Sequence, residues 1–176
     1  MPTRIAHAFV ATVLSLGLGG PAGAEDTPFE ASVNELRQVI GEWNVVTEEI
    51  NPDGSVASTL DGSYTFEWVI PDRVVSGRAE APAIDRVSAL LFYVSEAQEH
   101  IEMVSVAADG RLWVMTGELG DDTRYTQTFD TQDGGTGRLR FTRYNVSTDS
   151  FESRMEYTTD GGQTWTLGNH QVFTRK

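Results

Sequence analysis

Few side chains of this sequence can carry covalent or metal chemistry, because its 176 residues include no Cys and three His. His100 and Glu102 lie two residues apart, a spacing that places both on one face of an extended strand and could begin a metal site. A third ligand is missing, since no H-x-H or H-E-x-x-H pattern occurs. We therefore interpret this pair as part of a polar strand face and predict neither a metal site nor a cofactor.

The patterns typical of hydrolytic enzymes are also missing. The sequence has no Gly-x-Ser-x-Gly. The adjacent acids Glu48-Glu49 and Asp121-Asp122 would point to opposite faces of an extended chain, whereas glycoside hydrolysis needs two carboxylates that face one cleft. No catalytic residue is predicted. An isomerase or hydrolase built in the mouth of a barrel stays as an alternative to a binding protein.

The aromatic side chains are the most informative. Tyr64, Phe66 and Trp68 alternate with polar residues, which is the period of a strand with one buried face. In a closed meander the bulkiest apolar face is the natural one to turn inward. The alternative is a barrel that its own side chains fill. We predict that a ligand-binding wall is formed by Tyr64, Phe66, Trp68, Tyr125, Phe141, Arg143 and Met155.

Arg143 is the unusual member of this set. It shares a strand face with Leu139 and Phe141, and an inward guanidinium needs an anionic partner. An internal acid such as Glu67 or Glu118 could supply the anion, and so could the carboxylate of a ligand. We therefore predict a small, largely apolar ligand with Arg143 as its polar anchor, and both sources of the anion, an internal acid and a ligand carboxylate, stay open.

Short strands make up most of the chain and must position these residues. About ten strands follow one another at intervals of ~8–12 residues with turn residues between them, which is typical of an all-β sandwich or barrel. The order predicts an up-and-down antiparallel meander closed into a barrel. One short helix is expected over residues 27–40, either plugging one end or leading into the first strand. Asp160, Gly161 and Gly162 predict a tight final hairpin with Trp165 over the turn.

Two parts of the sequence resemble known families. Gly41-Glu42-Trp43 resembles the Gly-x-Trp signature of lipocalins, which often place an Arg of the last strand over that Trp. The stretches 62–70, 72–77 and 160–165 together resemble a bacterial exported lipocalin-like (calycin-type) β-barrel family of unknown function. The resemblance implies a calycin-type barrel in which Arg175 lies over Trp43, and it implies no catalytic motif.

His170 provides a further comparison. The haem-binding ten-stranded barrels called nitrobindins place an axial His near the C-terminus, so His170 resembles such a ligand. A haem-binding barrel that uses His170 is therefore an alternative function. Strand alternation puts His170 opposite Leu167 and Phe173, so it would point to solvent if that bulkier face is the interior.

The charge of the chain excludes some partners. It has 13 basic and 26 acidic side chains, a formal net charge of −13. Such an acidic chain lacks the basic patches that nucleic acids and anionic membrane surfaces need. Composition therefore favours a small molecule as the partner, and it does not predict an oligomeric state.

The N-terminus has the features of a signal peptide. A basic start ending at Arg4 is followed by the apolar run 5–18 and by Ala22-Gly23-Ala24, a small-residue cleavage site. We expect residues 1–24 to be removed and residues 25–176 to form one domain. An exported chain without Cys fits the periplasm or exterior of a bacterium, and the mature part contains no predicted membrane span.

The predicted signal peptide determines where the mature protein should begin. N-terminal sequencing of the protein from the periplasmic or secreted fraction should begin at Glu25, because cleavage follows the small-residue site. An intact Met1 in that fraction would contradict it.

Overall fold

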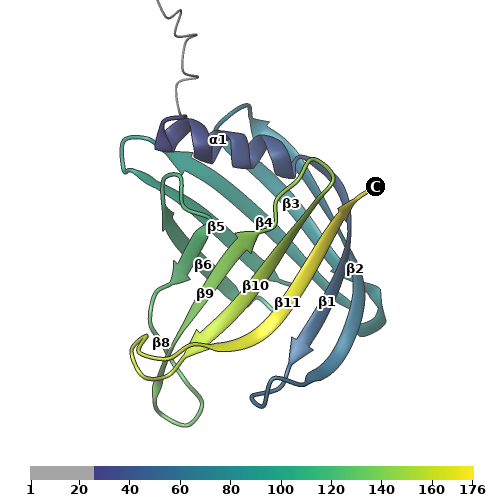
Figure 1. The fold of residues 1–176 in the computed structure, drawn as a ribbon, viewed down its shortest axis with the longest axis vertical. Coiled ribbons are helices and arrows are strands. Elements are labelled where there is room, and N and C mark those ends of the chain that lie inside the picture. Colours follow the sequence, from purple (N-terminus) through teal and green to yellow (C-terminus); the bar gives the residue numbers. More distant parts are fainter. Residues whose placement is uncertain (1–25) are drawn as a thin grey trace, which may run out of the picture.

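The computed structural model describes residues 26–176, so the signal peptide predicted for residues 1–24 lies outside the described part. The chain forms a helix followed by an antiparallel β-barrel (Figure 1). The elements are α1 (Pro28–Val39), β1 (Gly41–Ile50), β2 (Val56–Ile70), β3 (Val74–Ala81), η1 (Pro82–Ile84), β4 (Arg86–Ser95), β5 (His100–Ala107), β6 (Leu112–Glu118), β7 (Thr123–Thr126), β8 (Phe129–Asp130), β9 (Thr136–Tyr144), β10 (Ser150–Thr158) and β11 (Thr166–Arg175).

The predicted closed meander is confirmed. Strands β1 to β7 pair in chain order, β7 pairs with β9, and β9, β10 and β11 follow. The barrel closes because β11 returns to pair with β1. Ten strands form the wall, and the two-residue β8 is an extra strand beside β9. The pairing between neighbouring strands is shortest at β7, which shares two residue pairs with β6 and three with β9.

Helix α1 begins at a well-formed cap. The Thr27 hydroxyl accepts a hydrogen bond from the Glu30 backbone N–H at 3.2 Å, and the Glu30 carboxylate accepts one from the Thr27 N–H at 2.9 Å. This reciprocal arrangement satisfies two of the free donors at the helix start. The helix lies across one end of the barrel and buries its face of Ser32, Val33, Glu35, Leu36 and Val39. Among residues 26–176, no helix is both long and apolar enough to span a membrane.

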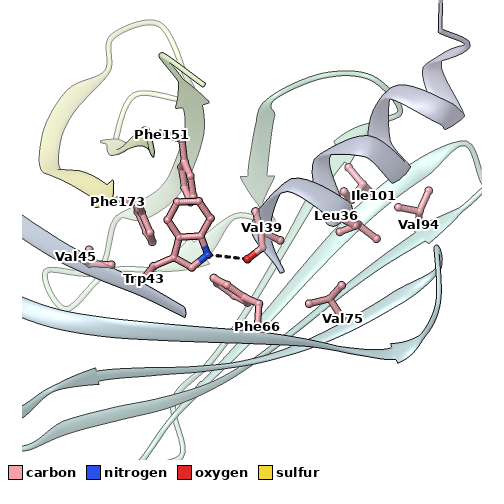
Figure 2. Close-up of a cluster of buried hydrophobic side chains, with 10 residues drawn as sticks. All are labelled: Leu36, Val39, Trp43, Val45, Phe66, Val75, Val94, Ile101, Phe151 and Phe173. Atoms are coloured by element: carbon pink, nitrogen blue, oxygen red, sulfur yellow. Dashed lines mark hydrogen bonds between the residues drawn. The ribbon is translucent and has the colours of Figure 1, made fainter. Parts of the chain in front are cut away.

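Trp43 anchors the junction between the helix and the barrel. Its side chain is 0% exposed, and its indole N–H donates to the Val39 carbonyl at 2.7 Å (Figure 2). The Phe151 ring packs edge-on against it, with 5.0 Å between ring centroids. The hydrogen bond lets a large amphipathic ring be buried without leaving its donor unsatisfied.

Arg175 lies over the ring of Trp43. Its guanidinium carbon lies 4.3 Å from the Trp43 ring centroid, the arrangement that the lipocalin resemblance implies. Arg175 also donates to the carbonyls of Gln38 and Ile40, each at 2.8 Å. These carbonyls belong to the helix C-terminus, where a cation is favourable. Gly41 is required beside it, because a Cβ there would lie 2.9 Å from Arg175 Nη1 and its φ is +118°.

The final hairpin has the predicted turn chemistry. Asp160 accepts hydrogen bonds from the Thr158 hydroxyl at 2.7 Å and from the Thr164 N–H at 3.0 Å. The hydrogen bond from the Thr164 hydroxyl, together with those from the Thr164 N–H and the Thr158 hydroxyl, holds the pKa of Asp160 well below its usual range. Gly161 and Gly162 both have positive φ, which a Gly adopts without strain.

The burial of Trp43 leads to a stability prediction. Trp43→Ala should lower the free energy of unfolding by about 3–5 kcal/mol, because it leaves a cavity and removes the platform for Arg175. Urea denaturation of the two proteins measures the difference. Trp165→Ala is the matched control, since Trp165 is only partly buried, and its loss should be smaller. An unchanged urea midpoint for Trp43→Ala would contradict the role of this residue.

Candidate functional site

The barrel interior is not filled. Beneath the buried cluster at the helix end lies a cavity of about 310 Å³, lined by inward residues of most strands and by Glu35 and Val39 of α1. Asp72, in the β2–β3 turn, pairs with Arg37 of α1, so this turn lies beside the helix. Strand β3 runs from there away from the helix, and β4 therefore begins at the opposite end of the barrel. The side chain of Arg86, the first residue of β4, lines the cavity and is 61% exposed. The cavity therefore reaches the surface at the end away from the helix.

Most of the wall is apolar. Because strands alternate, successive inward positions of each strand contribute to it. Its aromatic members are Tyr64, Phe66, Phe92, Trp113, Phe141, Phe151 and Phe173.

The structure brings five of the seven predicted wall residues to this cavity. They are Tyr64, Phe66, Phe141, Arg143 and Met155. Trp68 shares their strand face but packs against the buried cluster nearer the helix. Tyr125 lies on the outer surface, with its ring 5.9 Å from the ring of Trp165 and 4.6 Å from the guanidinium of Arg138. The reason is that β7 turns Arg124 inward, so that its neighbour Tyr125 points outward.

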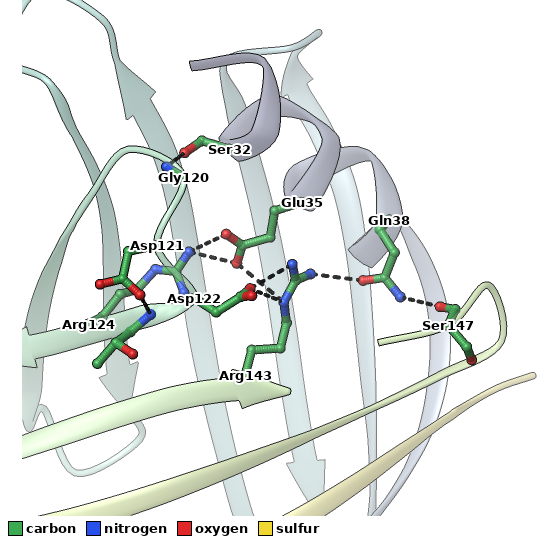
Figure 3. Close-up of polar contacts among 10 residues, drawn as sticks. Ser32, Glu35, Gln38, Gly120, Asp121, Asp122, Arg124, Arg143 and Ser147 are labelled. Carbon is green, nitrogen blue, oxygen red and sulfur yellow. Dashed lines mark hydrogen bonds and ion pairs between the residues drawn. The ribbon is translucent and has the colours of Figure 1, made fainter. Parts of the chain in front are cut away.

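Arg143 has internal partners, although not the two acids that the sequence suggested. Its Nε and Nη2 each lie 2.9 Å from Asp122, its Nη1 donates to the Gln38 side chain at 3.1 Å, and Glu35 is 3.9 Å away (Figure 3). The guanidinium therefore joins α1 to the barrel without needing a ligand to satisfy it. Glu67 and Glu118 are not among these partners.

A second arginine, Arg124, was not found from the sequence. Its Nη2 lies 2.6 Å from both carboxylate oxygens of Glu35, and the two side chains are 2% and 8% exposed (Figure 3). Its Nε is buried without a hydrogen-bond partner. In the sequence, only the alternation of β7 could have indicated that Arg124 points inward. The aromatic Tyr125 suggested instead that its own face of the strand is the inward one. Arg124 also packs its Cγ over Gly117, where a Cβ would be 3.1 Å away.

Polar groups also lie toward the open end. Gln171 donates to the Thr47 hydroxyl at 3.0 Å and, more weakly, to the Tyr64 oxygen at 3.5 Å. Burial raises the pKa of the Tyr64 phenol, so this group stays a neutral hydroxyl. One step further out, Asn169 pairs in register with Glu49, and its Oδ1 is buried without a partner. Gln171, Thr47 and Asn169 were also missed, because β1 and β11 are far apart in the sequence.

Both histidines of the described chain lie on the outer surface. His170 is 2.8 Å from Glu152 and 3.5 Å from Glu48. The inward positions of β11 are Asn169, Gln171 and Phe173, so the haem alternative lacks the inward His it requires. His100 lies 3.7 Å from Glu102. Within residues 26–176 no group of three or more His, Cys, Asp or Glu side chains is placed to hold a metal ion.

The adjacent acid pairs separate as expected. Glu49 lines the cavity, whereas Glu48 faces His170 outside. Asp121 accepts a hydrogen bond from the Thr123 N–H at 2.9 Å, and Asp122 binds Arg143.

Comparison with known proteins defines the fold only. No family model and no curated protein matches this sequence. An S-type phycobiliprotein lyase, CPES from Guillardia theta, has a TM-score of 0.50 at 12% identity, over 85% of this chain and 95% of that one. The protein EF1p2_mFAP2b bound to DFHBI has a TM-score of 0.42 at 14% identity, over 83% and 98% of the two chains. The likeness to the lyase is one of fold alone, an antiparallel β-barrel.

The buried ion pair leads to a prediction. Arg124→Met should lower the free energy of unfolding by about 3–5 kcal/mol, because it leaves the Glu35 carboxylate buried and unpaired. Replacing both residues, in Glu35→Gln with Arg124→Gln, should cost less than Arg124→Met, since no buried charge remains alone. Urea denaturation of the three proteins measures these differences. A larger loss in the double variant would contradict the pairing.

Proposed function

We propose that this protein binds a small, largely apolar molecule in the cavity beneath α1. The observation that carries this proposal is the cavity itself: about 310 Å³, with a mainly aromatic and aliphatic wall and a few polar groups. Small-molecule sites have this composition and volumes of ~300–1,000 Å³. The helix closes one end of the cavity, and the other end reaches the surface, where a ligand could enter.

The energetics of the interior support the same proposal. Unfilled volume in a protein core costs roughly 24 cal/mol per Å³, and a ligand that fills the space offsets this cost. Several residues that line the cavity toward the open end are small, as at Ala79, Ser88 and Ser105. The side chains therefore leave room in the part of the barrel that a ligand would reach first.

The setting that we propose is the bacterial periplasm or exterior, after removal of residues 1–24. The basic start, the apolar run and the small-residue cleavage site support it. Binding is favoured over catalysis because both histidines of the described chain lie outside the cavity and no nucleophile is paired with one there.

Binding can be tested with a neutral apolar probe. N-phenylnaphthylamine should become more fluorescent with the protein, because the cavity removes it from water. Ser105→Phe should weaken its binding at least tenfold, or ~1.4 kcal/mol, by filling the cavity.

The matched control is Val106→Phe, which adds a similar volume on the neighbouring, 40% exposed position. It should leave the affinity unchanged. If the probe does not bind, or binds equally to the two variants, the cavity is not a binding site.

A further inference from the structure

A buried donor without a partner lies at the helix end of the cavity. Arg124 lines the cavity with its side chain 2% exposed, and its Nε has no hydrogen-bond partner. A guanidinium offers only donors and keeps its charge in a protein. An unsatisfied donor in such a position is costly. An acceptor oxygen brought by a ligand would remove that cost.

The charges next to Arg124 favour an anionic acceptor, and the other acids that line the cavity, Glu49, Asp61 and Glu80, lie on β1, β2 and β3. Arg124 and Arg143 share the buried carboxylate of Glu35, at 2.6 Å and 3.9 Å. The other acid of the cluster, Asp122, is 48% exposed and reaches Arg143 from the loop before β7. Two guanidinium groups thus face one buried carboxylate. Hydrogen bonds between ionised partners are about twice as strong as neutral ones, so a carboxylate suits this position best.

A second unpartnered atom lies toward the opposite end. Asn169 lines the cavity next to Met155 and Glu49, its register partners, and its Oδ1 is buried without a hydrogen bond. A ligand hydroxyl can donate to a side-chain amide oxygen and accept from the amide nitrogen. Between the two ends, Phe66, Phe141 and Phe173 supply an apolar wall.

We propose that the ligand is an elongated amphipathic acid with a hydroxyl at its far end. Its carboxylate binds Arg124 Nε beneath α1, its apolar chain lies along the aromatic wall, and its hydroxyl meets Asn169 toward the open end. This inference rests on the proposed binding function and adds the class of ligand and its orientation.

The reverse orientation would place the carboxylate at Arg86. That guanidinium is 61% exposed and lies 4.0 Å from Glu49. An ion pair so open to water contributes little, whereas one at Arg124 is shielded. The inner position is therefore the stronger anchor.

A ligand series tests the inner anchor on the unchanged protein. Dodecanoic acid, dodecanol and dodecylamine differ in one terminal group and would be compared by their displacement of N-phenylnaphthylamine. The acid should bind at least tenfold more tightly than the alcohol or the amine. ω-Hydroxydodecanoic acid should bind more tightly still, because its hydroxyl reaches Asn169.

Two variants assign these preferences to residues. In Glu35→Gln with Arg124→Gln, the preference for acid over alcohol should fall below threefold, while Arg78→Gln, which removes an outward arginine, should leave it intact. In Asn169→Leu, the advantage of the hydroxy acid over dodecanoic acid should disappear. Asn44→Leu, an exposed position of β1, is the matched control.

The outcomes separate this inference from the proposed function. If N-phenylnaphthylamine binds and the acid and alcohol displace it equally, binding stands and the carboxylate anchor is overturned. The same holds if the double variant keeps the preference for acid. If N-phenylnaphthylamine does not bind at all, the proposed function fails and the inference fails with it.

Discussion

The burial of Trp43 is the constraint on which the rest of the structure depends. One ring touches the end of the helix through Val39, strand β10 through Phe151 and the last residue of the barrel through Arg175. Because the ring can be covered only when these parts meet, it fixes the helix and the closing strand together. The cavity follows from this arrangement, since it is the space left below a well-packed end.

The helix end is held by two kinds of contact with different effects. The apolar face of α1 stabilises the helix on the barrel end by burying apolar surface, and this hydrophobic contribution is not directional. Two polar contacts are directional and fix the position of α1. Glu35 binds Arg124, and Gln38 binds Arg143. A buried ion pair adds little net stability over a well-packed apolar pair, so its effect here is to define one position of the helix and to leave charge beside the cavity.

The fold could be predicted from the sequence because its determinants are local. The alternation of Tyr64, Phe66 and Trp68 and the Asp160-Gly161-Gly162 turn each act within a few residues, and their sum specifies a closed meander. The capping residues of α1 are local as well. The position of Arg175 over Trp43 came from a family resemblance, since the two residues are far apart in the chain.

The site could be predicted only where strand alternation was unambiguous. Phe141 and Met155 line the cavity, as the alternation of their strands indicates, whereas β7 is four residues long, too short for its inward face to be inferred, and Tyr125 lies on the outer surface. The partners of Arg143 and Arg124 come from α1 and from the loop before β7, and a chain with 26 acidic residues offers many equivalent candidates. Which acid pairs with which arginine depends on the three-dimensional closure of the barrel.

The pairing of β1 with β11 also sets the order in which the chain can fold. The first strand takes its second neighbour from β11, the last strand of the barrel, so the N-terminal half cannot complete its own core. Contacts between residues so distant in sequence are slow to form, because a long loop must close before they contribute. Until Thr166–Arg175 arrives, Trp43 and Val45 have no cover on that side, and the unfinished barrel presents an open strand edge. Strand β11 therefore determines when the barrel can complete its folding, in addition to forming part of its wall.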